Sequence, residues 1–204
     1  MTRRYSTRFQ PVTTPVLEDL SAHVLDIAQN SIAAEAGKIE VTIRKPRAGG
    51  GLMEFEIKDD GKGMDEARLS QVLSPFCTSR TTRRVGMGLP FLKQSSELCG
   101  GKFEISSAPE KGTQVRASFA PDNIDTPPLG DLAGAFLTLL IDAPKVRWIF
   151  KYESEENSFE LDSQELAEAI DGLESLTIPE VAMGLKTMME DGIVQIDEQN
   201  KGVE

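Results

Sequence analysis

Six short segments of this chain alternate between apolar and polar residues, strictly so at 38–44, and this pattern narrows the possible folds. Such alternation is typical of β-strands that bury one face and expose the other. Four segments lie in the N-terminal part of the chain and two lie in the C-terminal part. The pattern predicts strands around 38–44, 53–57, 103–105, 115–119, 146–152 and 158–161.

Segments with apolar residues at three- and four-residue spacing separate some of these strands and predict helices. Strands with a single apolar face need cover on that face only, so the order favours a mixed or largely antiparallel sheet with helices on one side. The predicted fold class is α/β, a two-layer sandwich followed by a small α+β C-terminal region. The last eight residues are expected to fray. Helices are expected at 16–36, 65–73, 89–99, 129–141, 163–173 and 179–190.

Charge is distributed unevenly along the chain. The formal net charge is −11, from 33 acidic and 22 basic side chains, and residues 153–204 alone hold 15 acidic and 2 basic ones. The rest of the chain is therefore nearly neutral, and the proline-rich stretch 121–128 is a candidate linker. We expect an N-terminal extension over 1–15, a main domain over 16–122 and an acidic α+β region over 123–204.

The composition also excludes several classes of protein. A bulk charge this negative argues against a nucleic-acid binder, whose contact surface would be basic. No stretch approaches the roughly 18 consecutive apolar residues of a membrane span, and no signal peptide is recognisable. Cys77 and Cys99 are too few for a disulfide framework and are expected to be small buried apolar residues. We expect a cytoplasmic protein that contacts neither nucleic acid nor membrane.

The first predicted helix has three polar residues beside its apolar arc. His23, Asp26 and Asn30 fall within about 60° of one another at helical spacing. One interpretation is a solvated polar stripe. The other is functional, because a carboxylate and a carboxamide one turn apart could position a water and hold Mg²⁺ through oxygen.

Two glycine-containing segments could approach a ligand closely. Asp59, Gly61 and Gly63 follow a predicted strand directly, where glycines allow close backbone approach and the carboxylate can accept a hydrogen bond from an exocyclic amine. The loop could equally be only a tight turn. Gly86 and Gly88 open a predicted helix, whose free N–H groups favour a phosphate, and Arg80, Arg83, Arg84 and Lys93 lie nearby in sequence. By itself this glycine pair could equally be only the entry to a helix, and the turn at 110–113 by itself is expected to be an ordinary hairpin turn.

The order and spacing of these segments resemble the ATP-binding domain shared by gyrase, heat-shock chaperone ATPases, histidine kinases and MutL, known as the GHKL or Bergerat fold. The resemblance covers about residues 18–119. LDIAQNSI at 25–32 is similar to the N box, DDGKG at 59–63 to the first glycine box, SPF at 74–76 to the F box, GMGL at 86–89 to the second glycine box, and GT at 112–113 to the third.

The resemblance implies a role for each matching residue. Asn30 would bind the Mg²⁺ that bridges the triphosphate of ATP, and Asp59 would accept the adenine amino hydrogen, with Thr113 nearby through water. Gly61 and Gly63 would shape the adenine pocket, and Gly86 and Gly88 would close a mobile lid over the phosphates. Asp26 matches the position of a glutamate that activates water in hydrolysing members. The other implied nucleotide contacts are Met64, Phe76, Arg80, Met87 and Leu89.

The local sequence is most similar to that of histidine kinases, but only about 17 residues precede the first helix, too few for the helical hairpin that bears their phosphoacceptor histidine. His23 is the sole histidine and lies on the nucleotide-binding helix itself. We therefore expect an ATP-dependent kinase module that acts on a separate protein partner, as anti-sigma-factor serine kinases of this fold do. The alternatives are a slow ATPase or nucleotide-gated switch, and an acidic interaction protein with a vestigial site.

Overall fold

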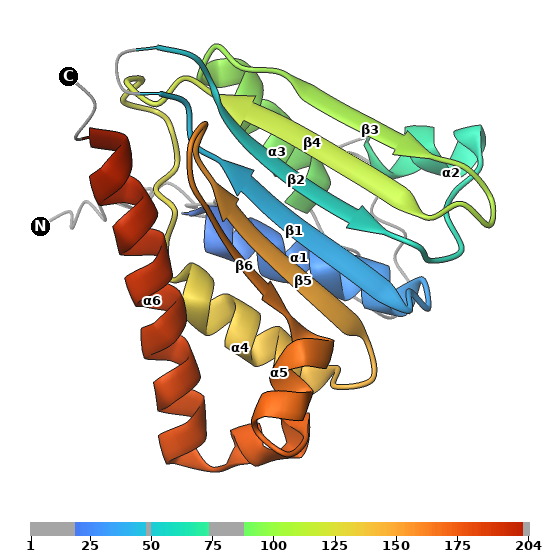
Figure 1. Ribbon diagram of the computed structural model, residues 1–204. Helices are drawn as coiled ribbons and strands as arrows, with labels where there is room; N and C mark the ends of the chain where they lie inside the picture. The colour runs from blue at the N-terminus through green and yellow to red at the C-terminus, as the bar shows by residue number, and fades with distance from the viewer. Residues whose placement is uncertain (1–18, 48–49, 74–87, 202–204) are drawn as a thin grey trace, which may run out of the picture.

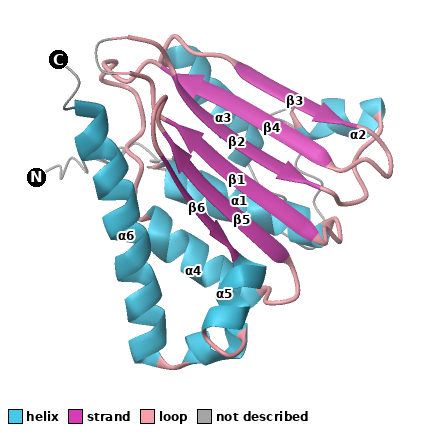
Figure 2. Ribbon diagram, viewed as in Figure 1, coloured by secondary structure: helices cyan, strands magenta, loops and turns pink. Residues whose placement is uncertain are grey.

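The computed structural model describes residues 19–47, 50–73 and 88–201, which form one six-stranded sheet with helices on one face (Figures 1 and 2). The predicted two-layer α/β sandwich is confirmed. The elements are α1 (Leu20–Ala33), β1 (Lys38–Arg44), β2 (Met53–Asp59), α2 (Glu66–Val72), α3 (Gly88–Leu98), β3 (Phe103–Ser107), β4 (Thr113–Phe119), α4 (Leu132–Asp142), β5 (Arg147–Glu153), β6 (Ser158–Asp162), α5 (Ser163–Ala169), the 3₁₀ helix η1 (Leu173–Thr177) and α6 (Pro179–Lys201).

The sheet is mixed, with the strand order β3-β4-β2-β1-β5-β6. Every neighbouring pair is antiparallel except β1 and β5, which run parallel through seven paired positions. At the centre of the sheet, Val41 of β1 lies opposite Ile57 of β2 on one side and Phe150 of β5 on the other. The parallel pair joins strands that are about 100 residues apart in the sequence.

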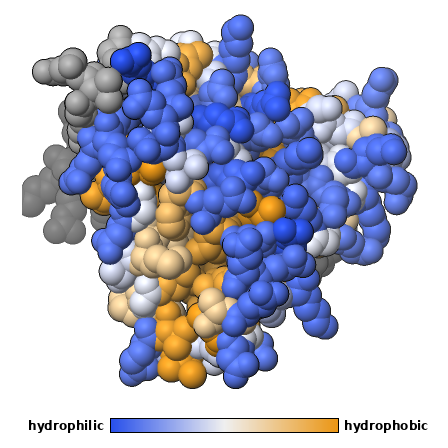
Figure 3. Space-filling model, viewed as in Figure 1, coloured by the Kyte–Doolittle hydropathy of each residue, from blue (hydrophilic) through white to orange (hydrophobic). Residues whose placement is uncertain are grey.

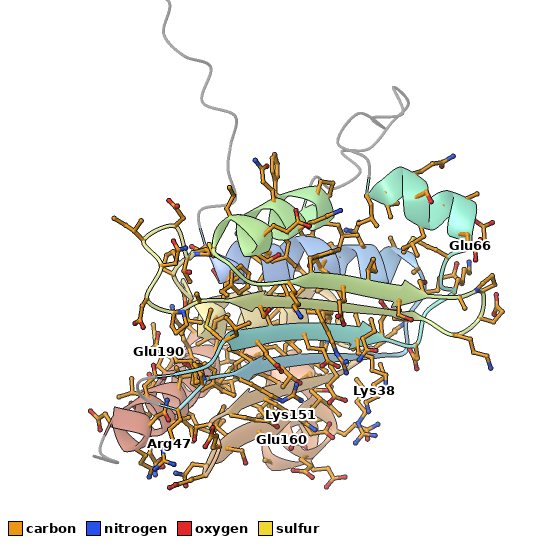
Figure 4. The ribbon with its side chains drawn as sticks, turned by 90° about the horizontal axis from the view of Figure 1, so that it is seen from above. Lys38, Arg47, Glu66, Lys151, Glu160 and Glu190 are labelled. Atoms are coloured by element: carbon orange, nitrogen blue, oxygen red, sulfur yellow. The ribbon has the colours of Figure 1, made fainter. Side chains whose placement is uncertain are left out.

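The alternation of the strands separates a buried face from a charged face. Val41, Ile57, Val115 and Phe150 point toward the helices and are at most 2% exposed. The opposite face is mostly hydrophilic, as Figure 3 shows. There Lys151 lies 3.3 Å from Glu40 and 3.8 Å from Glu160 (Figure 4). Ion pairs on a solvent-facing surface contribute little stability even when partly buried like these, so the fold depends on the apolar layer under the helices.

The N-terminal and C-terminal parts of the chain contribute to the same core. Strands β5 and β6 extend the sheet formed by the first four strands, and α4 packs beside α1. The backbone N–H groups of Leu20 and Ser21 donate to the carbonyls of Pro128 and Leu129, at 2.9 and 3.0 Å. A folding boundary near residue 122 stays a prediction, and it would have to divide this shared sheet.

The last helix differs from the sequence-based expectation. A helix ending near residue 190 and a frayed tail were expected, but α6 continues to Lys201. The distal part is held by long-range contacts: Ile196 is 4% exposed, Tyr152 Oη donates to Asp197 Oδ1 at 2.8 Å, and Asn200 Nδ2 donates to the Pro46 carbonyl at 2.8 Å. Neither α6 nor any other helix in the described ranges is both long and apolar enough to cross a membrane.

Candidate functional site

Asp59 is the last residue of β2 and is 8% exposed. The strand register places it between Ile39 of β1 and Thr113 of β4. Its Oδ1 accepts hydrogen bonds from the backbone N–H groups of Gly61 and Thr113 at 2.9 and 3.1 Å, and its Oδ2 accepts one from Ser31 Oγ at 2.6 Å. A carboxylate offers about four acceptor positions. Three neutral donors fix this one in place, and an acceptor position remains for a ligand amine.

Glycine is required at two positions in the loops around Asp59. Gly63 has φ +63°, and a Cβ there would lie 1.9 Å from the carbonyl oxygen of Ala108. Gly112 has φ +74°, and a Cβ there would lie 1.9 Å from the carbonyl oxygen of Asp59. Both glycines therefore let the two loops approach each other closely, which a side chain would prevent.

A cavity of about 460 Å³ opens beside Asp59, within the usual size range of small-molecule sites. Its wall is mainly apolar and contains a few polar groups, an arrangement that suits a flat aromatic base with a polar edge. The lining residues are Ile27, Asn30, Ser31, Ala33, Ala34, Ile57, Asp59, Lys62, Gly63, Met64, Arg68, Val72, Leu89, Thr113 and Val115.

Most sequence-predicted site residues that the structure describes meet at this cavity. Asn30, Asp59, Gly63, Met64, Leu89 and Thr113 line it, and Gly61 contributes the N–H that holds Asp59. Phe76, Arg80, Gly86 and Met87 lie outside the described residues. Sequence reasoning missed Ser31, Lys62 and Arg68 as lining residues. Ser31 directly follows Asn30, so its place on the same turn of α1 was the available signal.

Asp26 and Gly88 meet where α1 approaches the start of α3. A Cβ on Gly88 would lie only 2.0 Å from Asp26 Oδ2, so the glycine leaves room for the carboxylate. Among the described residues, this buried oxygen has no hydrogen-bond partner. Burial raises the pKa of Asp26, while the Gly88 backbone and the Asn30 side chain lower it. Asp26 does not itself line the cavity, but it lies one helical turn before Asn30, which does. A carboxyl group with a raised pKa near a ligand cavity is a candidate general base.

Asn30 is exposed on α1 at the edge of the cavity. Its carboxamide oxygen is the kind of hard ligand that Mg²⁺ accepts. Within the described ranges, no three His, Cys, Asp or Glu side chains gather to hold a metal by themselves. A Mg²⁺ ion at Asn30 would therefore need oxygens from a ligand, as in sites that combine few protein ligands with substrate phosphates.

His23 is fully buried rather than part of a solvated stripe, so that interpretation of the first helix is wrong for this residue. Neither ring nitrogen has a hydrogen-bond partner among the residues that the structure describes. Burial therefore lowers the pKa of His23 from 6.5 to about 4, against the opposing influence of Asp19 and the Gly88 backbone. The ring is neutral at pH 7.

We expect His23 to make the protein sensitive to mild acid. Below pH 6.5 the unfolded chain binds a proton at this side chain that the folded protein does not bind until about pH 4. The free energy of unfolding therefore decreases as the pH is lowered through this window. His23 alone should lower it by about 2 kcal/mol when the pH changes from 7 to 5. Urea unfolding of wild type and His23→Leu at both pH values measures this contribution as a difference. Equal pH dependence in the two proteins would contradict it.

Comparison with known proteins agrees with this geometry. The family described as Histidine kinase-, DNA gyrase B-, and HSP90-like ATPase matches residues 16–123, just over half of the chain. A putative sensor protein of Shewanella frigidimarina is 29% identical over 111 residues, 54% of this chain and 17% of the relative. Sensor histidine kinase YxdK of Bacillus subtilis is 35% identical over 69 residues, 32% of this chain and 21% of that protein.

A solved structure shares the fold. The crystal structure of the N-terminal domain of a DNA repair protein has a TM-score of 0.53 at 17% identity, and the match covers 72% of this chain and 53% of that one. The segments matched in the two sensor proteins make up about a fifth of the length of those relatives. The family match, the fold and the arrangement of the Asp59 cavity agree. This chain belongs to the family of histidine kinase-, DNA gyrase B- and HSP90-like ATPases and contains its ATP-binding domain.

Proposed function

We propose that this chain binds Mg²⁺-ATP in the cavity beside Asp59 and acts as a kinase module that transfers the terminal phosphoryl group to a separate protein. The observation that supports ATP binding most directly is the Asp59 carboxylate, held by three neutral donors at the apolar cavity. Its remaining acceptor position suits the exocyclic amine of adenine. The similarity to sensor histidine kinases favours phosphoryl transfer.

The residues of α1 would serve the phosphate end of the ligand. When bound, Mg²⁺ would neutralise charge on the phosphates, which is the main requirement of phosphoryl transfer. Asn30 would contribute its carboxamide oxygen to that ion from the edge of the cavity. Asp26, one turn earlier on the same helix, would accept the proton of the attacking hydroxyl or water.

The acceptor of the phosphoryl group would be in another protein. The sequence contains one histidine, His23, and it is fully buried between helices. A phosphoacceptor must reach the cavity from solvent, and His23 is inaccessible. The kinase-like sequence and the inaccessible histidine together favour a partner as the substrate.

Hydrolysis is the second candidate, because Asp26 Oδ2 is buried without a hydrogen-bond partner among the described residues and has a raised pKa. Such a group could activate water in place of a protein hydroxyl. The protein would then be a slow ATPase or a nucleotide-gated switch. The two candidates differ in where the terminal phosphate goes.

An assay with ATP labelled on its terminal phosphate distinguishes the candidates. We expect wild-type protein in a cell lysate to label a second protein, and Asn30→Ala to lower this labelling by roughly 100-fold through loss of the Mg²⁺ ligand. Gln29→Ala is the matched control, because Gln29 is an exposed neighbour outside the cavity lining. Absence of any labelled protein would contradict the kinase proposal. Free phosphate that falls roughly 100-fold in Asp26→Asn would then support hydrolysis.

A further inference from the structure

Ser107 connects two loops of the site. It is the last residue of β3 and is not among the residues that line the cavity. Its Oγ accepts the backbone N–H of Met64 at 2.8 Å, lies 2.9 Å from the carbonyl oxygen of Gly112 and lies 3.0 Å from Thr113 Oγ1. Met64, in the loop after β2, and Thr113, the first residue of β4, both line the cavity. One hydroxyl therefore joins the loop after β2 to the loop before β4.

The donors in this cluster can be assigned from chemistry. The Met64 N–H can only donate and the Gly112 carbonyl can only accept. Ser107 has a single hydroxyl proton, which the carbonyl of Gly112 takes. The contact between the two hydroxyls then requires Thr113 to donate to Ser107. With its proton used in this way, Thr113 Oγ1 has only lone pairs for any other partner.

The same threonine is tied to Asp59 through its backbone. The Thr113 N–H donates to Asp59 Oδ1 at 3.1 Å, and Thr113 lies opposite Asp59 in the β2–β4 register. Asp59 is itself an acceptor. The Asp59 and Thr113 side chains therefore both present acceptors, and neither presents a proton to a ligand. The nearby Ser31 hydroxyl donates its proton to Asp59 Oδ2 at 2.6 Å.

We propose that Ser107 is a positioning residue that sets the base preference of the site by holding Thr113 as a hydrogen-bond acceptor. This inference rests on the proposed ATP binding. An amino group at position 6 of a purine supplies two N–H donors and suits a pair of acceptors. An oxo group at that position needs a donor, which the site withholds while Ser107 accepts the Thr113 proton. The site therefore selects 6-aminopurine over 6-oxopurine nucleotides.

Calorimetric titration with ATP and with inosine triphosphate tests this role, because the two ligands have the same triphosphate and sugar. In Ser107→Ala the Thr113 hydroxyl is free to rotate and donate. We expect the ratio of the two dissociation constants to narrow by about tenfold. Ser107→Thr keeps a hydroxyl and should restore the ratio. Ser106→Ala is the matched control, since Ser106 is the exposed neighbour on the other face of β3, and it should keep the wild-type ratio.

If Ser107 had only a structural role, Ser107→Ala would weaken the binding of both nucleotides equally. An unchanged ratio of the two dissociation constants in Ser107→Ala would therefore overturn the proposal. Thr113→Val provides a second route if Ser107→Ala does not fold. Thr113→Val should narrow the ratio by itself, and adding Ser107→Ala to it should change the ratio no further, because the two residues act as one unit. Additive changes in the ratio would also overturn the proposal. Failure of wild-type protein to bind ATP would instead overturn the proposed function, and this inference with it.

Discussion

Replacing Asp59 with Asn is expected to weaken ATP binding by roughly 100-fold. In the wild type a charged carboxylate oxygen accepts from the adenine amine, whereas in the variant an NH₂ group, itself a donor, faces that amine. The two backbone N–H groups of Gly61 and Thr113 both point at Oδ1. The amide oxygen of Asn must take that position, because its NH₂ group cannot accept. The NH₂ group then lies at the Oδ2 position, where it meets Ser31 and faces the amine of a bound adenine.

The fold should survive this substitution. Ser31 Oγ can reverse its role and accept from the new NH₂ group, and it already lies 3.3 Å from the carbonyl oxygen of Ile27, to which it can donate. We therefore expect the loss to be confined to ligand affinity. Calorimetric titration with Mg²⁺-ATP measures the affinity, and circular dichroism during heating checks the fold.

The adjacent aspartate provides the control. Asp60 Oδ1 accepts from the backbone N–H groups of Gly37 and Lys38 at 2.7 and 2.8 Å, away from the cavity lining. Asp60→Asn keeps an oxygen for both donors and should leave ATP affinity within about twofold of wild type. A similar loss of ATP affinity in both variants, or an ATP affinity of Asp59→Asn within threefold of wild type, would show that Asp59 does not recognise the base.

The sequence predicted those parts of the fold that depend on local periodicity. Each expected strand is present, because alternation between a buried and a solvated face is visible residue by residue. The parallel pairing of β1 with β5 was not predictable in this way, since alternation does not say which strands become neighbours. The length of α6 was missed for the same reason: its second half is held by Tyr152 and Pro46, residues far away in the sequence.

Residues of the candidate site were likewise predictable only where they belong to a local sequence pattern. Asp59 and Gly63 were identifiable because a carboxylate and glycines directly after a strand form a local pattern. Ser107 was not, because its role arises only when β3 pairs with β4 and brings it against Gly112 and Thr113. The burial of His23 likewise depends on helices that pack against α1 from distant parts of the chain.

Removing residues 123–204 is expected to abolish both cooperative folding and ATP binding of the remaining chain. The deletion exposes the edge of β1 along all seven positions that pair with β5. It also removes four aromatic side chains that are at most 1% exposed, namely Phe136, Trp148, Phe150 and Tyr152. Each such side chain contributes roughly 3 kcal/mol or more, so their sum is comparable to the total stability of a typical domain, about 5–15 kcal/mol.

The effect should reach the nucleotide site through α1. This helix bears Asp26 and Asn30, packs beside α4, and has the N–H groups of Leu20 and Ser21 bonded to the carbonyls of Pro128 and Leu129. Without residues 123–204 the apolar face of α1 loses part of its cover and those donors lose their partners. We expect the chain that ends at residue 122 to show no cooperative thermal transition and no heat of ATP binding.

Cleavage of the backbone within residues 123–204 is the matched control, because it breaks the chain while the contacts between the two parts remain. Ile124 is 97% exposed, so a protease site inserted beside it can be cut in the folded protein. The nicked protein should keep its unfolding transition and its ATP affinity, since β5 stays paired with β1. If the shortened chain instead unfolds at the same temperature as the full chain and binds ATP equally well, residues 16–122 are an independent domain, and the sheet continuity contributes nothing to the nucleotide site.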